Sequence, residues 1–496
     1  DPPRWLLEKV CTTTLDSMLT EALADSDLLF DDKAGACLRF KHGLTRDSLY
    51  ETIGLYERRL LHRRVLEALS TRPDALRRDA LTEALAKHSR GAGAWTDAST
   101  HCERAGDRAA EAFAMDRARE QFLSALDALD RCGLASRDAA AHATSYARLT
   151  AKLGLTCIFD PLALDNDASV FERAVRLTKA QGDSRAAALA LYWHAYMLYG
   201  FGQYRDARRV AREALTHSQT AGDERLAAQI DATLGQILAA ASDYDEAMVR
   251  MDCALDAKRR HARPGSGIAV GSAYTLSCKG SVLADRGEFP DAYRCFDQAL
   301  ELLGETMHPV GNSVRNWIAV TRIWHGDWTR AEIVATDSIR IAETTRALFL
   351  LSVSRSALGY ARWCRDQDTD GLRLLDDAVQ WLVARGGHLY ASLHYGWLAE
   401  ARVFQRRHAE ARTLAARTLQ RVRHGERLGE AAASRAMAIA AARDGDAFGA
   451  LRWIARAERS AALRGSPRES ALNALAQGIV LLERGRPDEG LHAIQR

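Results

Sequence analysis

The chain has 496 residues, of which 47% are hydrophobic and 27% are charged, and its formal net charge is +3. So small a charge for this length excludes a strong whole-molecule field for nucleic acid or an anionic membrane. The length also exceeds what one compact core holds. It indicates either about three domains or a repeat array in which each unit packs only on its neighbours.

The cysteines and the termini bear on where the protein works. Nine cysteines are scattered along the chain, none forms a C-x-x-C pair, and their number is odd. This usage is typical of reduced thiols in the cytoplasm rather than of a disulfide framework or a zinc site. No apolar run has membrane-spanning length and there is no signal-peptide pattern, so no membrane partner is expected. The chain starts at Asp1 without methionine and stops inside a repeat, so we expect a fragment of a larger protein.

The first predicted feature is a basic segment, RFKHGLTRDSLYETIGLYERRLLHRRV, over residues 39–65. A tight Phe-x-His stretch is followed by a predicted helix over residues 55–69. Four arginines lie partly on one side of this helix: Arg58, Arg59, Arg63 and Arg64. That side is either a phosphate or nucleic-acid patch or a solvated, acid-paired interdomain face. The second interpretation is favoured, and no direct nucleic-acid contact is expected.

The same segment resembles a junction found in large bacterial signal-transduction ATPases. There, an AAA-type or STAND nucleotide-binding domain ends in a small winged-helix-like part, and a repeat array follows. The resemblance is carried by Phe40, His42, Leu44, Arg46, Tyr50, Arg58, Arg59, Leu61, His62 and Arg64. The group includes LuxR-type transcription regulators and ATPase-linked adenylyl cyclases. The resemblance implies that residues 1–70 are the end of such a subdomain with its basic linker helix. It also implies that ATP or ADP binds on an upstream domain outside this chain, which itself holds no cofactor.

The resemblance also implies a contact with the nucleotide or with the neighbouring ATPase domain. In related switch ATPases a histidine of this subdomain approaches the nucleotide, and His42 is the candidate here, with Arg39 and Arg46 beside it. The alternative is that His42 only caps or packs a helix. His62, in RRLLHRRV, is interpreted as a structural helix residue.

Residues 71–184 are interpreted as irregular N-terminal helical repeats. Small residues at Ala98, Ala105, Ala118 and Ala125 have the spacing expected of paired helices. Two antiparallel helices approach closely only where the facing side chains are small.

Residues 185–496 carry a register that repeats eight times. Predicted interhelix turns recur every 39–45 residues, at Gly202, Ser242, Gly287, Gly326, Asp366, Arg406, Gly445 and Gly485. The residue seven before each turn and the residue five after it are always alanine or glycine. We therefore predict that each turn joins a helix A to an antiparallel helix B, and that the small residues meet where the two helices cross.

This register resembles the tetratricopeptide repeat in its longer form of about forty residues. The predicted fold is all-α. It is a right-handed superhelical solenoid of antiparallel helix pairs over residues 185–496, preceded by a small winged-helix-like or helical segment.

In repeats of this type the A helices line the concave face. Positions ten, six and three residues before the turn tend to face the groove, and Trp324 lies beside the same stripe. The candidate groove residues are Tyr192, Tyr196, Tyr199, Gln236, Ser281, Asn316, Trp324, Tyr360, Trp363 and Glu400. Aromatic residues at helical spacing also serve interhelix packing, so the three tyrosines stay open between groove and core. Trp193, Trp317 and Trp397 share one register position, which suggests packing between repeats.

Catalytic motifs are missing. There is no G-x-x-x-x-G-K-[ST] loop, no G-x-G-x-x-G after a strand, no H-E-x-x-H and no G-x-S-x-G. We therefore expect no catalytic residues and no metal ligands, and a chain that is no enzyme. The expected function is that of a ligand-sensing and protein-interaction region of a bacterial signal-transduction ATPase, in a transcription regulator.

The expected partners are a peptide, a protein or a small-molecule inducer on the concave face, the neighbouring ATPase domain and, as an option, a second copy of the chain. Two other functions stay open. One is a stand-alone tetratricopeptide scaffold for protein complexes, and the other is the regulatory arm of an adenylyl cyclase. Both differ from the leading interpretation only in domains outside the chain.

Overall fold

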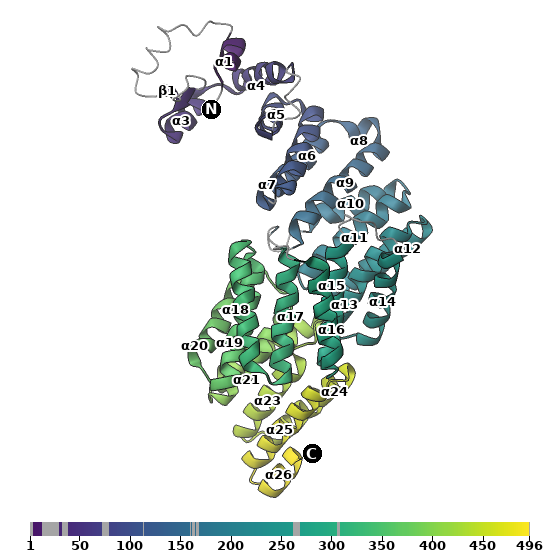
Figure 1. Ribbon diagram of the computed structural model, residues 1–496, viewed down its shortest axis with the longest axis vertical. Helices are drawn as coiled ribbons and strands as arrows, with labels where there is room; N and C mark the ends of the chain where they lie inside the picture. The colour runs from purple at the N-terminus through teal and green to yellow at the C-terminus, as the bar shows by residue number, and fades with distance from the viewer. Residues whose placement is uncertain are drawn as a thin grey trace. The chain divides into compact units, whose positions relative to one another are not determined.

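The chain folds into two compact units, Asp1–Thr156 and Cys157–Arg496. The computed structural model describes residues 3–11, 29–31, 38–71, 79–112, 114–158, 160, 164, 168–260, 268–304 and 308–495. Within these ranges the secondary structure is helical apart from one pair of three-residue strands. The prediction of an all-α fold built from antiparallel helix pairs is confirmed (Figure 1).

The described residues of the first unit form nine helices and strands, followed by one last helix. They are α1 (Arg4–Cys11), β1 (Leu29–Asp31), β2 (Leu38–Phe40), α3 (Gly43–Thr52), α4 (Leu55–Ser70), α5 (Asp79–Ala92), α6 (Trp95–Glu111), α7 (Met115–Arg131), α8 (Leu134–Arg137) and, last, α9 (Ala139–Cys157). The two strands pair antiparallel, with Phe30 opposite Arg39. Leu6, Leu66 and Leu85 are buried where α1, α4 and α5 meet, and this cluster forms a small core.

Helices α6 and α7 of the first unit pack as an antiparallel pair through small residues. The four alanines predicted for this contact are all buried: Ala98, Ala105, Ala118 and Ala125. A Cβ atom on Gly106 would lie 2.5 Å from the ring of Phe122, so only glycine leaves room for that ring. The predicted small-residue spacing therefore marks a real helix crossing.

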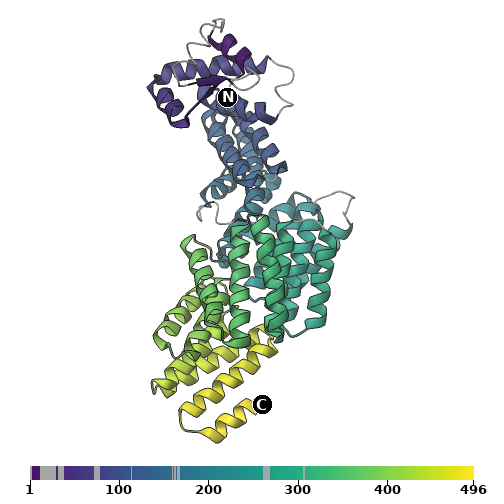
Figure 2. The same ribbon diagram turned by 60° about the vertical axis from the view of Figure 1, so that its left-hand side comes forward.

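In the described part of the second unit, α10 is followed by sixteen helices in eight pairs. The helices are α10 (Ser169–Ala180), α11 (Ser184–Gly200), α12 (Tyr204–Thr220), α13 (Glu224–Ala240), α14 (Tyr244–Arg260), α15 (Ile268–Asp285), α16 (Phe289–Leu303), α17 (Pro309–His325), α18 (Trp328–Thr344), α19 (Leu348–Asp366), α20 (Thr369–Ala384), α21 (Ala391–Phe404), α22 (His408–Arg423), α23 (Glu430–Arg443), α24 (Ala447–Arg464), α25 (Pro467–Glu483) and α26 (Pro487–Gln495). Figures 1 and 2 show the pairs stacked along this unit, from the teal α11 to the yellow α26.

The predicted turns have the backbone conformation that ends a helix. Seven of the eight predicted positions have a left-handed φ: Gly202 (71°), Ser242 (64°), Gly287 (80°), Gly326 (82°), Arg406 (61°), Gly445 (81°) and Gly485 (70°). In the fifth turn the left-handed residue is Gln367 (54°), one position after the predicted Asp366. Glycine adopts this conformation without a steric penalty, which explains why it dominates the set.

The small residues before and after each turn face each other across the helix pair. A Cβ atom on Gly359 would lie 2.4 Å from the carbonyl oxygen of Gly371, which is the small residue on the partner helix. A Cβ atom added to Gly235 would likewise lie 3.2 Å from the carbonyl oxygen of Ala247. The backbones of helices A and B therefore approach closely at the positions that the register predicts.

The A helices form the inside of the second unit. Each A helix packs on the A helix of the next repeat, from α11 on α13 to α23 on α25, and each B helix packs on its flanking A helices. Residues are buried around most of the circumference of A helices such as α13, α21 and α23. A helix that is buried all round lies in an interior rather than on a surface.

The superhelix closes on itself along a contact that we call the seam. It is formed by the turns at Gly202, Ser242 and Gly287 together with three loops of later repeats, residues 385–390, 424–429 and 464–467. Tyr199 Oη lies 2.8 Å from Tyr390 Oη, and Arg464 Nη1 donates to Asp285 Oδ2 at 2.9 Å. Asp285 also accepts from Tyr244 and Ser466 at 2.7 and 2.9 Å. The seam therefore joins residues that are as much as about two hundred positions apart in sequence.

Glu426 lies in the seam and is expected to make the second unit less stable as pH rises. Its side chain is 0% exposed, Oε1 accepts the Ser392 backbone N–H at 2.8 Å, and Oε2 has no hydrogen bond although Arg421 Nε lies 3.5 Å away. Burial raises the pKa of Glu426 from 4.5 to about 7, against the opposing effects of Arg421 and Ser392. Between pH 4.5 and about pH 7 the folded chain holds a proton on Glu426 that the unfolded chain has lost. The free energy of unfolding that this proton contributes is complete below pH 4.5 and is lost as pH rises through 7.

The variant Glu426→Gln keeps an acceptor for Ser392 and removes this titration. Its free energy of unfolding is expected to exceed that of the wild type by about 2–3 kcal/mol at pH 8 and by little at pH 4. Urea denaturation at several pH values measures the difference. Burial lowers the pKa of His388 and of His394 to about 4, so both residues make the folded chain less stable at low pH. This effect is the same in the wild type and in the variant, and it cancels when the two free energies of unfolding are subtracted. Parallel pH profiles for the two proteins would contradict the assignment.

Candidate functional site

A cavity of about 390 Å³ lies on the inside of the second unit, and we call it the inner groove. Its walls come from five successive A helices, α17, α19, α21, α23 and α25, and from the first turn of α18. The lining residues that matter below are Trp324, Trp328, Tyr360, Trp363, Glu400, Phe404, Arg435, Arg468 and Leu475. Small-molecule and peptide sites typically have this size and this concave form.

The wall of the inner groove is largely apolar, and part of it is open to solvent. Phe404 at the end of α21 is 52% exposed, and Leu475 and Trp328 are 40% and 37% exposed. Deeper in, Trp324 and Tyr360 are buried, and the ring of Tyr360 stacks on Trp397 with the ring centroids 4.4 Å apart. Exposed apolar side chains around a cavity are the usual mark of a surface that another molecule covers.

One side of the inner groove is polar. Arg435 Nε donates to Glu400 at 2.6 Å, and Arg435 Nη1 donates to Glu469 and to Asn473. Burial by itself lowers the pKa of Arg435, but Glu400 and Glu469 raise it by more, so the net shift is upward. Burial likewise opposes the ionisation of Glu469, but Arg435, Arg468 and Arg464 lower its pKa to about 2. Arg435 and Glu469 are therefore both ionised at neutral pH.

Two hydrogen-bond donors of the inner groove have no partner among the described residues. They are Nη2 of Arg435 and Nε1 of Trp324, and both atoms are buried. A buried donor without an acceptor costs about 1–3 kcal/mol, more when it is charged. A ligand that places an oxygen atom against either donor would recover that cost. The groove is thus suited to a molecule with an apolar body and at least one hydrogen-bond acceptor.

Four of the ten predicted groove residues line this cavity together: Trp324, Tyr360, Trp363 and Glu400. Sequence reasoning had not proposed Phe404, Arg435, Arg468 or Leu475. A signal for two of them was present, because Arg435 and Leu475 stand ten residues before the turns at Gly445 and Gly485.

The other six predicted groove residues lie in the packed interior of the earlier repeats. Tyr192, Tyr196 and Tyr199 pack ring against ring in α11, and burial raises the pKa of Tyr196 and Tyr199 well above its ordinary value. Gln236 donates to Thr275 at 3.3 Å, Ser281 donates to the Cys278 carbonyl, and Asn316 is buried. The seam explains this position, because the later repeats cover the inner face of the first ones. Trp193, Trp317 and Trp397 are buried, which agrees with the packing role suggested for them.

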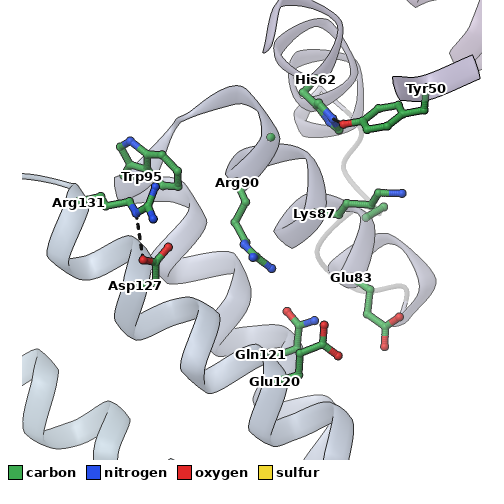
Figure 3. A pocket seen from close by; sticks show the side chains of 12 residues that line it. Tyr50, His62, Glu83, Lys87, Arg90, Trp95, Glu120, Gln121, Asp127 and Arg131 are labelled. Atoms are coloured by element: carbon green, nitrogen blue, oxygen red, sulfur yellow. Dashed lines mark hydrogen bonds and ion pairs between the residues drawn. The ribbon is translucent and has the colours of Figure 1, made fainter. Parts of the chain in front are cut away.

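A second cavity, of about 720 Å³, lies in the first unit between α3, α4, α5, α6 and α7 (Figure 3). On one side of it the guanidinium of Arg131 lies 4.9 Å from the Trp95 ring centroid, and Arg131 donates to Asp127 at 3.0 Å. Figure 3 shows Arg90 between this group and Lys87, with Glu120 and Gln121 below it. Cations and carboxylates are mixed in this cavity, so it does not select one sign of charge.

A chain of three hydrogen-bonded rings closes one end of this second cavity. Tyr50 Oη lies 2.9 Å from His62 Nε2, and His62 Nδ1 lies 2.9 Å from His88 Nδ1. Burial, with smaller effects of His62 and Lys87, lowers the pKa of His88 to about 4, so the pair is neutral at pH 7. A Cβ atom on Gly91 would lie 2.5 Å from the His62 ring. His62 is thus a buried packing residue of α4, as the sequence indicated.

The three residues predicted to contact a nucleotide or an ATPase domain lie at the start of the first unit. His42 is exposed at the N-cap position of α3, and its side chain makes no capping hydrogen bond. Arg46 is exposed and pairs with Asp47 at 2.7 Å. The backbone of Arg39 belongs to β2, and its side chain lies outside the described part. None of these positions is tested by a bound molecule, so their role stays a prediction.

Metal sites and membrane spans are absent from the described ranges. No group of three or more His, Cys, Asp and Glu side chains there is arranged to hold a metal ion. No helix in those ranges combines the length and the apolar character that crossing a bilayer requires.

The fold and the inner groove define an all-α repeat protein with a concave site between its inner helices. No protein-family model and no curated protein matches the sequence. Solved helical-repeat structures resemble it at low sequence identity.

One similar structure is that of a Rap protein complexed with competence and sporulation factor, with 12% identity, a TM-score of 0.40, and coverage of 72% of this chain and 90% of that one. Another is the apo form of the quorum sensor NprR from B. thuringiensis, with 16% identity, a TM-score of 0.41, and coverage of 66% and 96%. A third is a signal transduction ATPase with numerous domains and a tetratricopeptide repeat sensor from Pyrococcus horikoshii, with 12% identity and a TM-score of 0.39. The match covers 82% of this chain and 58% of that ATPase.

Proposed function

We propose that this chain is a non-catalytic sensor and interaction region whose inner groove binds a peptide segment. The observation that carries the proposal is the convergence of Trp324, Tyr360, Trp363 and Glu400 on one cavity with an exposed apolar rim. These residues come from three different repeats. Tyr360, Trp363 and Glu400 are predicted from their register positions, and Trp324 because it lies beside the same stripe. Their meeting supports the concave face of the later repeats as the binding surface.

The chemistry of the inner groove favours a peptide over a purely apolar ligand. Phe404, Trp328 and Leu475 offer contact area for one or two apolar side chains. The unpartnered donors of Arg435 and Trp324 call for oxygen acceptors. A peptide supplies both, because backbone carbonyls accompany every side chain. Hot spots of binding interfaces are also rich in tryptophan and arginine.

In this proposal the chain is the sensor of a bacterial signal-transduction ATPase that regulates transcription, and it acts in the cytoplasm. The support for the ATPase is the resemblance of residues 39–65 to the junction that follows such a domain. The walls of the inner groove come from five repeats, so a bound peptide contacts all of them at once. The bound peptide shifts the equilibrium between two arrangements of the protein only to the extent that it binds one arrangement more tightly than the other.

A display library of random linear peptides, selected on the whole chain, tests the proposed site. Selected peptides are expected to bind in a saturable manner, and Phe404→Ala or Trp363→Ala is expected to weaken them by about tenfold or more. Fluorescence anisotropy with labelled peptides measures the affinity. The matched control is Phe448→Ala on α24, since Phe448 is 72% exposed and lines neither cavity described above. Equal losses in Phe404→Ala and Phe448→Ala, or unchanged affinity in both groove variants, would refute the site.

A further inference from the structure

A third cavity, of about 390 Å³, lies in the seam and shares no lining residue with the inner groove. One wall is formed by the start of α12 and by the turns at Ser242 and Gly287, which contribute Arg205, Arg208 and Arg286. The loop between α22 and α23 contributes Arg427, and it touches the start of α12, where the Arg205 backbone N–H donates to the His424 carbonyl at 3.2 Å. We call this space the seam cavity.

Positive charge dominates the seam cavity. Its charged lining residues are four arginines and two aspartates, Asp243 and Asp245. Arg208 pairs with Asp243 at 3.4 Å and Arg286 with Asp245 at 2.5 Å, and Asp245 is 94% exposed. An ion pair with so exposed a carboxylate is weak and screened by salt. The two acids therefore neutralise at most two of the four cations.

The two remaining arginines, Arg205 and Arg427, have little or no compensation. Arg205 has no acidic partner within the described residues. Arg427 lies 4.0 Å from Glu430 Oε2, while Arg456 holds the other oxygen of Glu430 at 2.8 Å. The exposed His424 lies beside the cavity; burial, followed by Arg421 and Arg205, lowers its pKa, and Asp206 opposes them. The charge of Arg205 therefore acts on this wall of the cavity.

The Ser242 side chain presents a buried hydroxyl without a hydrogen-bond partner at the same cavity. Ser242 lines the seam cavity, is 2% exposed, and its Oγ makes no hydrogen bond within the described residues. Its backbone has a φ of 64°, which non-glycine residues rarely adopt. The cavity also adjoins the first turn of α14, which begins at Tyr244, and the partial positive charge of a helix N-terminus acts there beside the acidic side chains of Asp245 and Glu246. The Ser242 hydroxyl and this helix end both favour an oxygen acceptor.

We propose that the seam cavity binds a small molecule through a phosphate or diphosphate group. Arg205 from the start of α12 and Arg427 from the loop between α22 and α23 hold the phosphate, and Ser242 Oγ donates a hydrogen bond to it. A guanidinium presents two parallel N–H groups that match two oxygens of a phosphate, and several arginines around one anion are typical of phosphate recognition. The volume of about 390 Å³ leaves room for more than one phosphate group.

Such a ligand would stabilise the closed superhelix. Arg205 and Arg427 stand more than two hundred residues apart, and they approach each other only while the seam is formed. A ligand that binds only the closed form raises its stability by mass action. The proposal is independent of peptide binding in the inner groove, because the two cavities share no residue.

Isothermal titration of the whole chain with pyrophosphate tests this proposal. One saturable site is expected, at constant ionic strength set with sodium chloride. Arg205→Gln and Arg427→Gln are each expected to weaken it by about tenfold or more. The control is Arg209→Gln, because Arg209 lies on the same helix α12 as Arg205, pairs with Asp206, and does not line the cavity. All three side chains are partly or fully exposed, so the variants are expected to fold.

Titration with citrate separates phosphate from other anions. Weaker binding of citrate than of pyrophosphate supports a phosphate site. Citrate binding that is as tight and equally sensitive to Arg205→Gln would overturn the phosphate assignment in favour of a carboxylate. The proposal as a whole fails if pyrophosphate gives no binding beyond that of chloride, or if both seam variants retain the wild-type affinity.

Discussion

Replacing Arg464 by alanine is expected to lower the free energy of unfolding of the second unit by about 3–5 kcal/mol. Arg464 at the end of α24 is 1% exposed and donates to Asp285, which is 2% exposed, at 2.9 Å. Asp285 has two further partners, Tyr244 and Ser466, but neither carries a compensating positive charge. The substitution therefore leaves a buried carboxylate without its cation. Removing one partner of a buried ion pair costs far more than the pair itself contributes.

Urea denaturation followed by tryptophan fluorescence measures this effect, because eight of the ten tryptophans lie in the second unit. The matched control is Arg459→Ala, on the exposed side of the same helix, which is expected to change stability by at most about 0.5 kcal/mol. Replacing Arg464 and Asp285 together by leucine is expected to cost less than the single Arg464→Ala change, since no unpaired charge remains. If Arg464→Ala is as stable as Arg459→Ala, the seam does not hold the superhelix closed.

The second large effect is expected for Gly359→Ala in α19, which should lower the free energy of unfolding by about 1–3 kcal/mol. Alanine is intrinsically the better helix former by about 1 kcal/mol, so propensity alone predicts the opposite sign. Sterics prevail because the new Cβ atom would lie 2.4 Å from the Gly371 carbonyl oxygen and 2.8 Å from the Leu375 nitrogen. Both are backbone atoms and cannot rotate away, so α19 and α20 must separate.

Gly359→Val should be more destabilising than Gly359→Ala, since two further carbons enter the same contact. The matched control on α19 is Arg355→Ala, whose side chain is 43% exposed and forms only a surface ion pair with Glu343 at 3.5 Å. Denaturation curves of the three variants give the order of stability. A stabilised Gly359→Ala would mean that the small residues of the register do not mark a close crossing of helices.

The helix pairs could be predicted from sequence because their cause is local. A crossing of two antiparallel helices needs a small residue on each, and the intervening turn needs a left-handed residue, so three positions recur in every repeat. Gly359 with Gly371 and Gly478 with Gly490 supply the small residues of two crossings, and Gln367 and Gly485 are the left-handed residues of the turns between them. The one displaced turn, at Gln367 instead of Asp366, contains no glycine that would have fixed its position.

The candidate site could be predicted only in part. Trp324, Tyr360, Trp363 and Glu400 line the inner groove, and the register extended to the last two turns would have added Arg435, Leu475, Ile439 and Ile479. The seam had no such signal. The seam is formed by single residues that follow no periodic pattern, such as Asp285, Arg464 and Tyr390. Whether they meet depends on the sum of the rotation angles between successive repeats. For that reason the candidate groove residues of the earlier repeats are buried in the described structure, while those of the later repeats line the inner groove.

A crystal structure of the whole chain with one of the selected peptides tests the central claim most directly. The account predicts peptide density in the inner groove, with an apolar side chain against Phe404 and Trp363 and an oxygen atom within hydrogen-bonding distance of Arg435 Nη2 or Trp324 Nε1. Density in the cavity between α3 and α7, or on the outer face formed by the B helices, would contradict it.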